Sequence, residues 1–206
     1  MSSSVPPTMT KDLAAAIRRS FEQSAHDEEH FPSTIDPRIH HVKLVLHHLG
    51  QCSRVLDLGC GKGRFARLVK QANPAARVVA LDLAEAMLRV APSDLLRVSA
   101  SMLDLPFPDK TFDGLYATES LEHAVDIERA IAEMCRVLKP GGRLLIIDKN
   151  ADHWGRLPTP PWEKWFRQEE LSSLLRRHGL TVDCRPISYW EDVPPDGLFL
   201  AWLASK

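Results

Sequence analysis

Short apolar runs alternate with helical patterns through the middle of the chain. Seven such runs predict strands, at 53–58, 77–81, 95–98, 112–117, 143–147, 180–186 and 198–204. Apolar residues spaced three and four apart predict helices at 64–72, 85–90, 126–138 and 169–178. Strands that alternate with helices form right-handed βαβ units and a parallel sheet. We therefore expect an α/β fold, a doubly wound and mostly parallel sheet of seven strands with an antiparallel edge strand.

The two flanks of this pattern differ from its centre. Six of the nine His lie before residue 50, and all five Trp lie after residue 153. We expect a disordered tail at 1–12, where Ser and Pro dominate, and an N-terminal helical cap at 13–50. Residues 51–206 form the expected core. Within it, the stretch at about 150–166 holds three Trp and three Pro, and its length and aromatic content are typical of a lid.

The composition is that of an ordinary globular protein. The 206 residues are 44% hydrophobic and 26% charged, with a net charge of −1, so one domain fits the length. The balanced charge disfavours a nucleic-acid partner. No apolar run is long enough to span a membrane, and the first residues lack the apolar stretch of a secretory signal. The four Cys form no metal-binding pattern, so we expect a cytoplasmic protein with free thiols.

A glycine-rich loop follows the first predicted strand and opens a helix. Its glycines, at 59, 61 and 63, allow a tight turn and the close approach of a ligand to the backbone. Asp82 ends the second strand, 23 residues after Gly59. An acidic residue roughly 20 residues on binds ribose hydroxyls in dinucleotide-binding folds. The pattern therefore predicts a nucleoside ligand with a free ribose.

The loop is poorly suited to a pyrophosphate. Arg64 stands where the dinucleotide motif requires its third glycine, and Asp57 lies two residues before the first glycine. A carboxylate at that place repels phosphate and attracts a cation. The nucleoside that fits is S-adenosylmethionine, whose tail carries a positive sulfur. A nicotinamide-dependent oxidoreductase is the disfavoured alternative.

Four segments resemble the class I S-adenosylmethionine-dependent methyltransferases, and in particular their small-molecule branch, which includes the ubiquinone and menaquinone biosynthetic enzymes. They are VLDLGCGKGRF at 55–65, VVALDLAEAML at 78–88, LDLPFPDKTFDGLYATESLEH at 103–123 and RVLKPGGRLLIID at 136–148. The resemblance implies a Rossmann-like sheet and S-adenosylmethionine as cofactor. It also implies that Asp57 and the backbone of Gly59 and Gly61 face the methionine portion. Asp82 would bind both ribose hydroxyls, and Thr118 would line the methionine end.

The resemblance further implies two walls around the adenine ring. They are formed by Leu83 and Met87 on one side and by Ser101, Met102 and Leu103 on the other. Many relatives carry Asp where this chain has Ser101. Whether Ser101 or Asp104 binds the adenine amino group therefore stays open.

His123 is the candidate general base. It follows the fourth predicted strand, whose carboxyl end faces the ligand crevice of an open α/β sheet, and an ordinary imidazole pKa of about 6.5 suits proton transfer near neutrality. The alternative is a structural His that shields the cofactor. A second alternative is a divalent metal held by Glu119, Glu122 and His123 on one helical face, with His153 completing the set. We favour a site without metal.

The aromatic stretch at 152–166 offers a wall for the methyl acceptor. Its flat apolar side chains are Trp154, Trp162, Trp165 and Phe166. The alternative is that they form a small core or a dimer surface.

We expect an S-adenosylmethionine-dependent methyltransferase of a small-molecule acceptor, with transfer to oxygen, acting as a monomer or homodimer. The alternatives are N- or C-methylation of a small molecule, a nucleic-acid methyltransferase, and a non-catalytic subunit that kept the fold.

Overall fold

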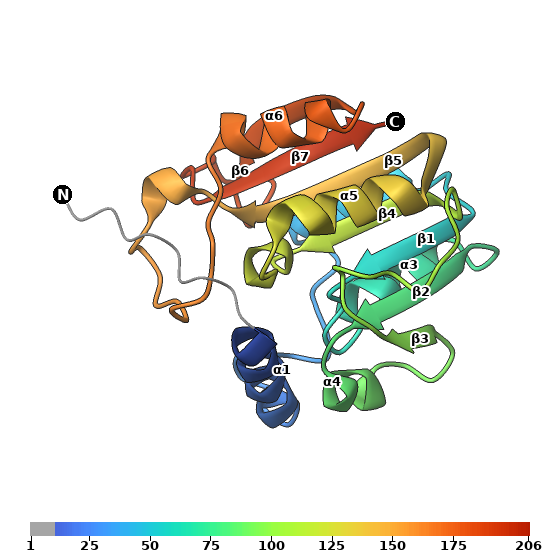
Figure 1. Ribbon diagram of the computed structural model, residues 1–206, viewed down its shortest axis with the longest axis vertical. Helices are drawn as coiled ribbons and strands as arrows, with labels where there is room; N and C mark the ends of the chain where they lie inside the picture. Colours follow the sequence, from blue (N-terminus) through green and yellow to red (C-terminus); the bar gives the residue numbers. More distant parts are fainter. Residues whose placement is uncertain (1–10) are drawn as a thin grey trace.

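The computed structural model describes residues 11–206 and forms one α/β sandwich (Figure 1). Its sheet has seven strands in the order β3-β2-β1-β4-β5-β7-β6. The strands are β1 (Arg54–Leu58), β2 (Arg77–Asp82), β3 (Leu96–Ser99), β4 (Phe112–Thr118), β5 (Leu138–Lys149), β6 (Thr181–Ile187) and β7 (Phe199–Ser205). All neighbours from β3 to β5 pair in parallel, and β7 pairs antiparallel with both β5 and β6. The expected mostly parallel, seven-stranded sheet is confirmed, with its antiparallel strand β7 next to the β6 edge.

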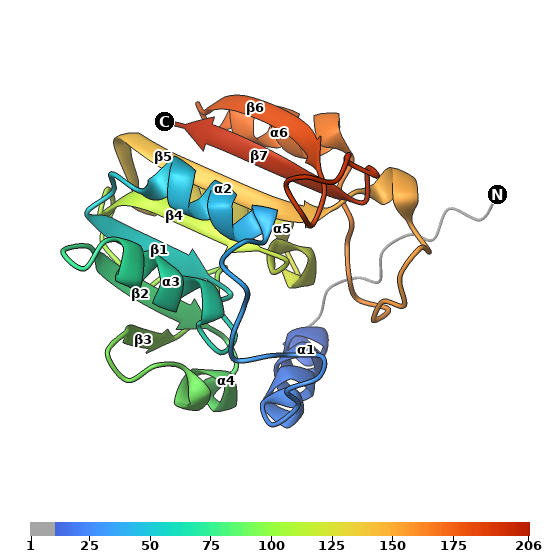
Figure 2. The ribbon, with the colours of Figure 1, turned by 180° about the vertical axis from the view of Figure 1, so that it is seen from behind.

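Within residues 11–206, six α-helices accompany the sheet. They are α1 (Lys11–Ser24), α2 (His40–Leu49), α3 (Arg64–Ala72), α4 (Glu85–Val90), α5 (Ile127–Val137) and α6 (Gln168–Arg177). Helices α5 and α6 cover one face of the sheet, and α2 and α3 cover the other (Figures 1 and 2). Helix α1 lies apart from both layers, packed against α4. Of the predicted 13–50 cap, α1 therefore stands beyond the sheet, whereas α2 belongs to a layer of the core.

The predicted tail was too long at its inner end. Helix α1 begins at Lys11, so positions 11 and 12 are helical and not part of a tail. The rest of the predicted tail, residues 1–10, lies outside the described residues.

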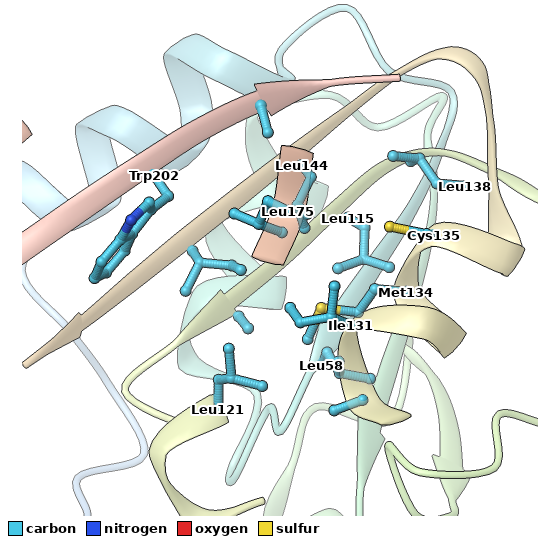
Figure 3. Packing of buried hydrophobic residues seen from close by; sticks show 14 of the residues in the cluster. Leu58, Leu115, Leu121, Ile131, Met134, Cys135, Leu138, Leu144, Leu175 and Trp202 are labelled. Carbon is cyan, nitrogen blue, oxygen red and sulfur yellow. The ribbon is translucent and has the colours of Figure 1, made fainter. Parts of the chain in front are cut away.

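The core is built from two layers of apolar side chains, one on each face of the sheet. Between the sheet and α5, Leu58 and Leu115 pack with Ile131 and Met134, each fully buried (Figure 3). Trp202, on β7, closes the α6 end of this layer. Burial of a Leu, Ile or Met side chain contributes roughly 1.5–3 kcal/mol to folding. This core holds the strands rigidly, and their carboxyl ends carry the loops described next.

Candidate active site

A cleft of about 730 Å³ opens at the carboxyl ends of β1, β2 and β4. Its floor comes from the glycine-rich loop and the strand ends, and its walls come from α1 and from residues 158–163. The volume lies in the range of pockets that hold small molecules and cofactors. Apart from Asp104, the alternative to Ser101, every residue proposed above for the cofactor or for proton transfer lines this one cleft: Asp57, Gly59, Gly61, Asp82, Leu83, Met87, Ser101, Met102, Leu103, Thr118 and His123.

The glycine-rich loop needs its glycines for conformation and for space. Gly59 has φ +74°, and a Cβ there would lie 2.5 Å from the Cβ of Ser120. Gly61 has φ +52°, and a Cβ there would meet nothing within 4 Å. Its backbone therefore borders open space in the cleft, where a ligand can approach closely.

Asp57 is a buried carboxylate that lacks a partner on one side. The residue is 1% exposed, and its Oδ2 accepts no hydrogen bond from the part of the chain that the structure describes. Burial, together with the negative charge of Asp82, raises the pKa of Asp57 to about 7. An unpaired buried carboxylate is costly, so a cationic ligand would be favoured here.

Asp82 is fixed by the backbone around it. Its Oδ2 accepts a hydrogen bond from the Gly61 N–H at 2.7 Å, and its Oδ1 accepts one from the Ala84 N–H at 2.8 Å. A carboxylate has about four acceptor positions, so two remain for ligand hydroxyls. Burial raises its pKa despite these hydrogen bonds.

The two candidates for the adenine amino group differ in position. Ser101 lines the cleft, and its Oγ accepts a hydrogen bond from the Leu103 N–H at 3.1 Å. Asp104 is exposed and lies outside the cleft lining. The geometry therefore favours Ser101 over Asp104 as the partner of the adenine amino group.

His123 lies at the end of a short 3-10 helix, Leu121–His123, with its ring 4.9 Å from that of Phe21 on α1. Its Nε2 is 3.6 Å from Glu122 Oε1, and its Nδ1 is 4.0 Å from Glu163 Oε1. Burial and the nearby positive charge of Lys149 lower the pKa of His123 to about 3. The ring is therefore neutral at physiological pH, and its buried Nδ1 has no hydrogen-bond partner within residues 11–206.

The carboxylates beside His123 surround a lysine. The Lys149 Nζ is 2.6 Å from Glu122 Oε1 and 3.1 Å from Glu163 Oε2. Burial and the neighbouring Asp148 carboxylate raise the pKa of Glu122. Sequence analysis pointed to neither Lys149 nor Glu163, because the partners of Lys149 lie 27 and 14 positions away along the chain.

The metal set that the sequence offered as an alternative does not come together. Glu119 has φ +49° and precedes the 3-10 helix, and its carboxylate lies 3.7 Å from His41 Nδ1. His153 lies beside Gly197 instead. Three potential ligands do gather, namely Glu122, His123 and Glu163. However, the Lys149 ammonium lies between the two carboxylates and supplies the positive charge that a metal would bring.

Only one of the four predicted aromatic wall residues reaches the cleft. Trp162 lines it, together with Pro158 and Pro160. Trp154 is 56% exposed and makes an edge-to-face contact with the buried Trp165. Phe166 is 1% exposed and packs against Trp202 in the core, as the alternative interpretation held.

Helix α1 is held over the cleft by polar contacts that the sequence did not reveal. The Glu22 carboxylate accepts hydrogen bonds from the N–H groups of Glu85 and Ala86, at 2.8 and 2.9 Å, at the start of α4. Glu28, which lies just after α1, accepts a hydrogen bond from the buried Lys62 of the glycine-rich loop at 2.7 Å. These contacts join α1 and the residues after it to the start of α4 and to the glycine-rich loop.

Comparison with known proteins identifies the family. The profile of the family described as "Methyltransferase domain" matches residues 56–146. A 2-phytyl-1,4-naphtoquinone methyltransferase from Thermosynechococcus vestitus is 30% identical over 81% of this chain and 78% of its own length. The chain belongs to the class I S-adenosylmethionine-dependent methyltransferases.

Other members of this methyltransferase family differ in the atom that their names specify. The ubiquinone/menaquinone biosynthesis C-methyltransferase UbiE of Bordetella parapertussis is 41% identical over 62% of this chain and 63% of its own length. The O-methyltransferase cnsE of Penicillium expansum is 32% identical over 64% of this chain and 53% of its own length. The chain spans about half the length of the first curated relatives it matches.

A solved methyltransferase shares the whole fold. The 1,6-didemethyltoxoflavin-N1-methyltransferase of Burkholderia thailandensis has a TM-score of 0.68 and 24% identity, and the match covers 100% of this chain and 92% of that one. That enzyme was solved with its acceptor and S-adenosylhomocysteine bound. In the chain described here, no helix within residues 11–206 is long and apolar enough to cross a membrane.

Proposed function

We propose that this methyltransferase transfers a methyl group to a hydroxyl oxygen of a small, flat, largely apolar acceptor. The observation that carries the proposal is the continuity of the cleft. The nucleoside end, with Asp57 and Asp82, and the aromatic end, with Phe21, Trp162 and His123, line one space of about 730 Å³.

The residues at the nucleoside end fit S-adenosylmethionine. Asp57 offers a buried unpaired oxygen to a positive charge, Asp82 offers acceptor positions to ribose hydroxyls, and Gly61 leaves room beside its backbone. When bound, the cofactor supplies a methyl group on a positively charged sulfur. The protein's share of the work is then alignment, worth up to about 7–11 kcal/mol in well-oriented reactions.

His123 is placed to receive the acceptor proton. Its ring is neutral and lines the cleft, and one nitrogen of a neutral imidazole can accept a hydrogen bond from a hydroxyl bound there. Because burial and Lys149 lower its pKa, it is a weak base. It therefore suits an acidic hydroxyl, such as a phenol or an enol, whose proton it takes as the oxygen gains the methyl group.

The charges that line the acceptor end also narrow the acceptor class. Glu119, Glu122 and Glu163 all border the cleft, and the nearby Lys149 is already paired with two of them. These carboxylates would repel a carboxylate or phosphate on the acceptor. This favours an uncharged part of the acceptor beside His123.

C-methylation is the second candidate. A hydroquinone that loses a proton to His123 becomes nucleophilic at oxygen and at the adjacent ring carbon. The relative from Bordetella, named as a C-methyltransferase, makes this candidate specific. The position of the acceptor against Trp162 would then decide between the two atoms.

The test supplies S-adenosylmethionine labelled with carbon-13 in the methyl group, together with 1,4-dihydroxynaphthalene and simple phenols. We expect S-adenosylhomocysteine to form, and the carbon chemical shift of the product distinguishes a methoxy group from a C-methyl group. His123→Gln should lower kcat by at least about 10²-fold while S-adenosylhomocysteine affinity stays near wild type. Normal turnover in this variant would contradict the role of His123.

A further inference from the structure

The wall of the cleft formed by Pro158, Pro160 and Trp162 has few connections of its own. Among the described residues, positions 157–162 make no ion pair, and their one hydrogen bond to the rest of the chain runs from the Glu163 N–H to the Pro160 carbonyl, at 3.1 Å. The Trp162 Nε1 is buried without a partner. The position of this wall therefore depends on the contacts at its two ends.

The two ends are anchored very differently. On one side, Arg156 pairs with Asp196 at 3.0 Å, with side chains 47% and 51% exposed. On the other side, Glu163 pairs with Lys149 at 3.1 Å, with side chains 5% and 11% exposed. Exposed ion pairs contribute little, whereas a buried pair is costly to break because it leaves a charge unpaired.

Lys149 connects this wall to the core through both its backbone and its side chain. It ends β5, and its carbonyl accepts a hydrogen bond from the Phe166 N–H at 3.0 Å. Its ammonium bridges Glu163 to Glu122, next to the candidate base, and lies 5.8 Å from the centre of the Trp165 ring. The Trp165 indole in turn donates to Glu163 at 3.1 Å.

We propose that Lys149 is a positioning residue that anchors the Trp/Pro-rich segment (residues 152–166) and so sets the place of the acceptor wall at Trp162. The inference deepens the proposed function, since it names what fixes the acceptor side of the same cleft. It assigns Lys149 no contact with the reacting atoms.

The test observes the wall directly, without acceptor or turnover. Protein labelled with 5-fluorotryptophan gives a fluorine resonance for Trp162 and one for Trp202, which is fully buried in the core and reports global folding. In Lys149→Met we expect the Trp162 resonance to move toward that of the free amino acid, with Trp202 unchanged. Exchange of the hydrogen-bonded Glu163 and Lys164 amides should accelerate by about tenfold, as expected for a lost hydrogen bond between charged groups.

Matched variants complete the design. Lys149→Arg keeps the cation and should restore the wild-type Trp162 resonance. Arg156→Met breaks the exposed pair at the other end and should leave that resonance and the exchange rates within about twofold of wild type. S-adenosylhomocysteine affinity, measured by calorimetry, should change less than about threefold in every variant, because the nucleoside end is separate.

An unchanged Trp162 resonance in folded Lys149→Met would overturn the proposal, as would an equal effect of Arg156→Met. If Lys149→Met loses the Trp202 resonance as well, Glu163→Ala decides, since it removes only the partner on the segment. Release of Trp162 with Trp202 unchanged then supports the anchor, and no release overturns it. A wild-type protein that fails to bind S-adenosylhomocysteine would contradict the proposed function. The fluorine spectra would still show whether Lys149 anchors the segment.

Discussion

At the scale of single residues, the candidate site rests on two buried carboxylates with different duties. Asp82 has both oxygens held by backbone N–H groups, so its orientation is fixed before any ligand arrives. Asp57 keeps one oxygen unpaired and has a raised pKa. The proposed function assigns the first to the ribose hydroxyls and the second to the positive charge of the cofactor.

Replacing Asp82 tests the first duty. Asp82→Asn should weaken S-adenosylmethionine and S-adenosylhomocysteine alike, because each charge-assisted hydrogen bond contributes about 1.5–3 kcal/mol. Isothermal titration calorimetry measures both affinities. Asp104→Asn, at an exposed position outside the cleft lining, is the control and should bind as wild type does. Equal affinities in the two variants would reject the ribose role.

Asp57 predicts a dependence of cofactor affinity on pH. Its pKa in the free protein is raised to about 7 by burial, and a bound positive charge favours the ionised form. Below pH 7 binding must therefore release a proton, so the affinity for S-adenosylmethionine should fall by up to about tenfold per pH unit on acidification. Calorimetry across this range should show the trend, and Asp57→Asn should abolish it. A flat profile in the wild type would refute the assignment.

At the scale of elements, the sequence could predict what is local and repetitive. The apolar runs and the glycine-rich loop predicted every strand of the sheet and the binding loop, because period and turn chemistry are properties of neighbouring residues. The contacts among Lys149, Glu122 and Glu163 were beyond it, since they join residues 14 and 27 positions apart through the fold. The alternative metal site assumed that Glu119 shares a helix with Glu122 and His123. It does not form, because Glu119 has a positive φ and precedes that helix. Aromatic content could not distinguish Trp162, in the cleft, from Phe166, in the core.

Helix α1 predicts an effect on the cofactor through one contact at the start of α4. Glu22→Ala removes the carboxylate that accepts from Glu85 and Ala86, so α1 should open more often. Loss of such hydrogen bonds is worth about 1–3 kcal/mol. We expect faster amide exchange across residues 12–24 and weaker S-adenosylhomocysteine binding. Arg19→Ala, an exposed position on the same helix, is the control and should change neither measurement.

At the scale of the whole molecule, the fold separates recognition of the cofactor from recognition of the acceptor. The nucleoside end is built from loops at the ends of strands β1 and β2, which the central core holds rigidly. The acceptor end is built from parts outside the sheet, namely α1 and the Trp/Pro-rich segment. A change in the Trp/Pro-rich segment can therefore alter acceptor binding without altering cofactor binding, whereas a change in α1 affects both.

This separation predicts opposite outcomes for two tryptophans on the same segment. Trp162→Ala removes a flat wall of the cleft and should raise acceptor KM or lower kcat, because methyl transfer requires the acceptor to be held in line and water to be excluded. Trp154→Ala removes a side chain that is 56% exposed and outside the cleft lining, and it should leave kinetics unchanged. Steady-state kinetics with an identified acceptor, alongside thermal unfolding of both variants, decide the matter. If Trp162→Ala lowers only the melting temperature and keeps normal kinetics, this wall serves the core and the acceptor must bind elsewhere along α1.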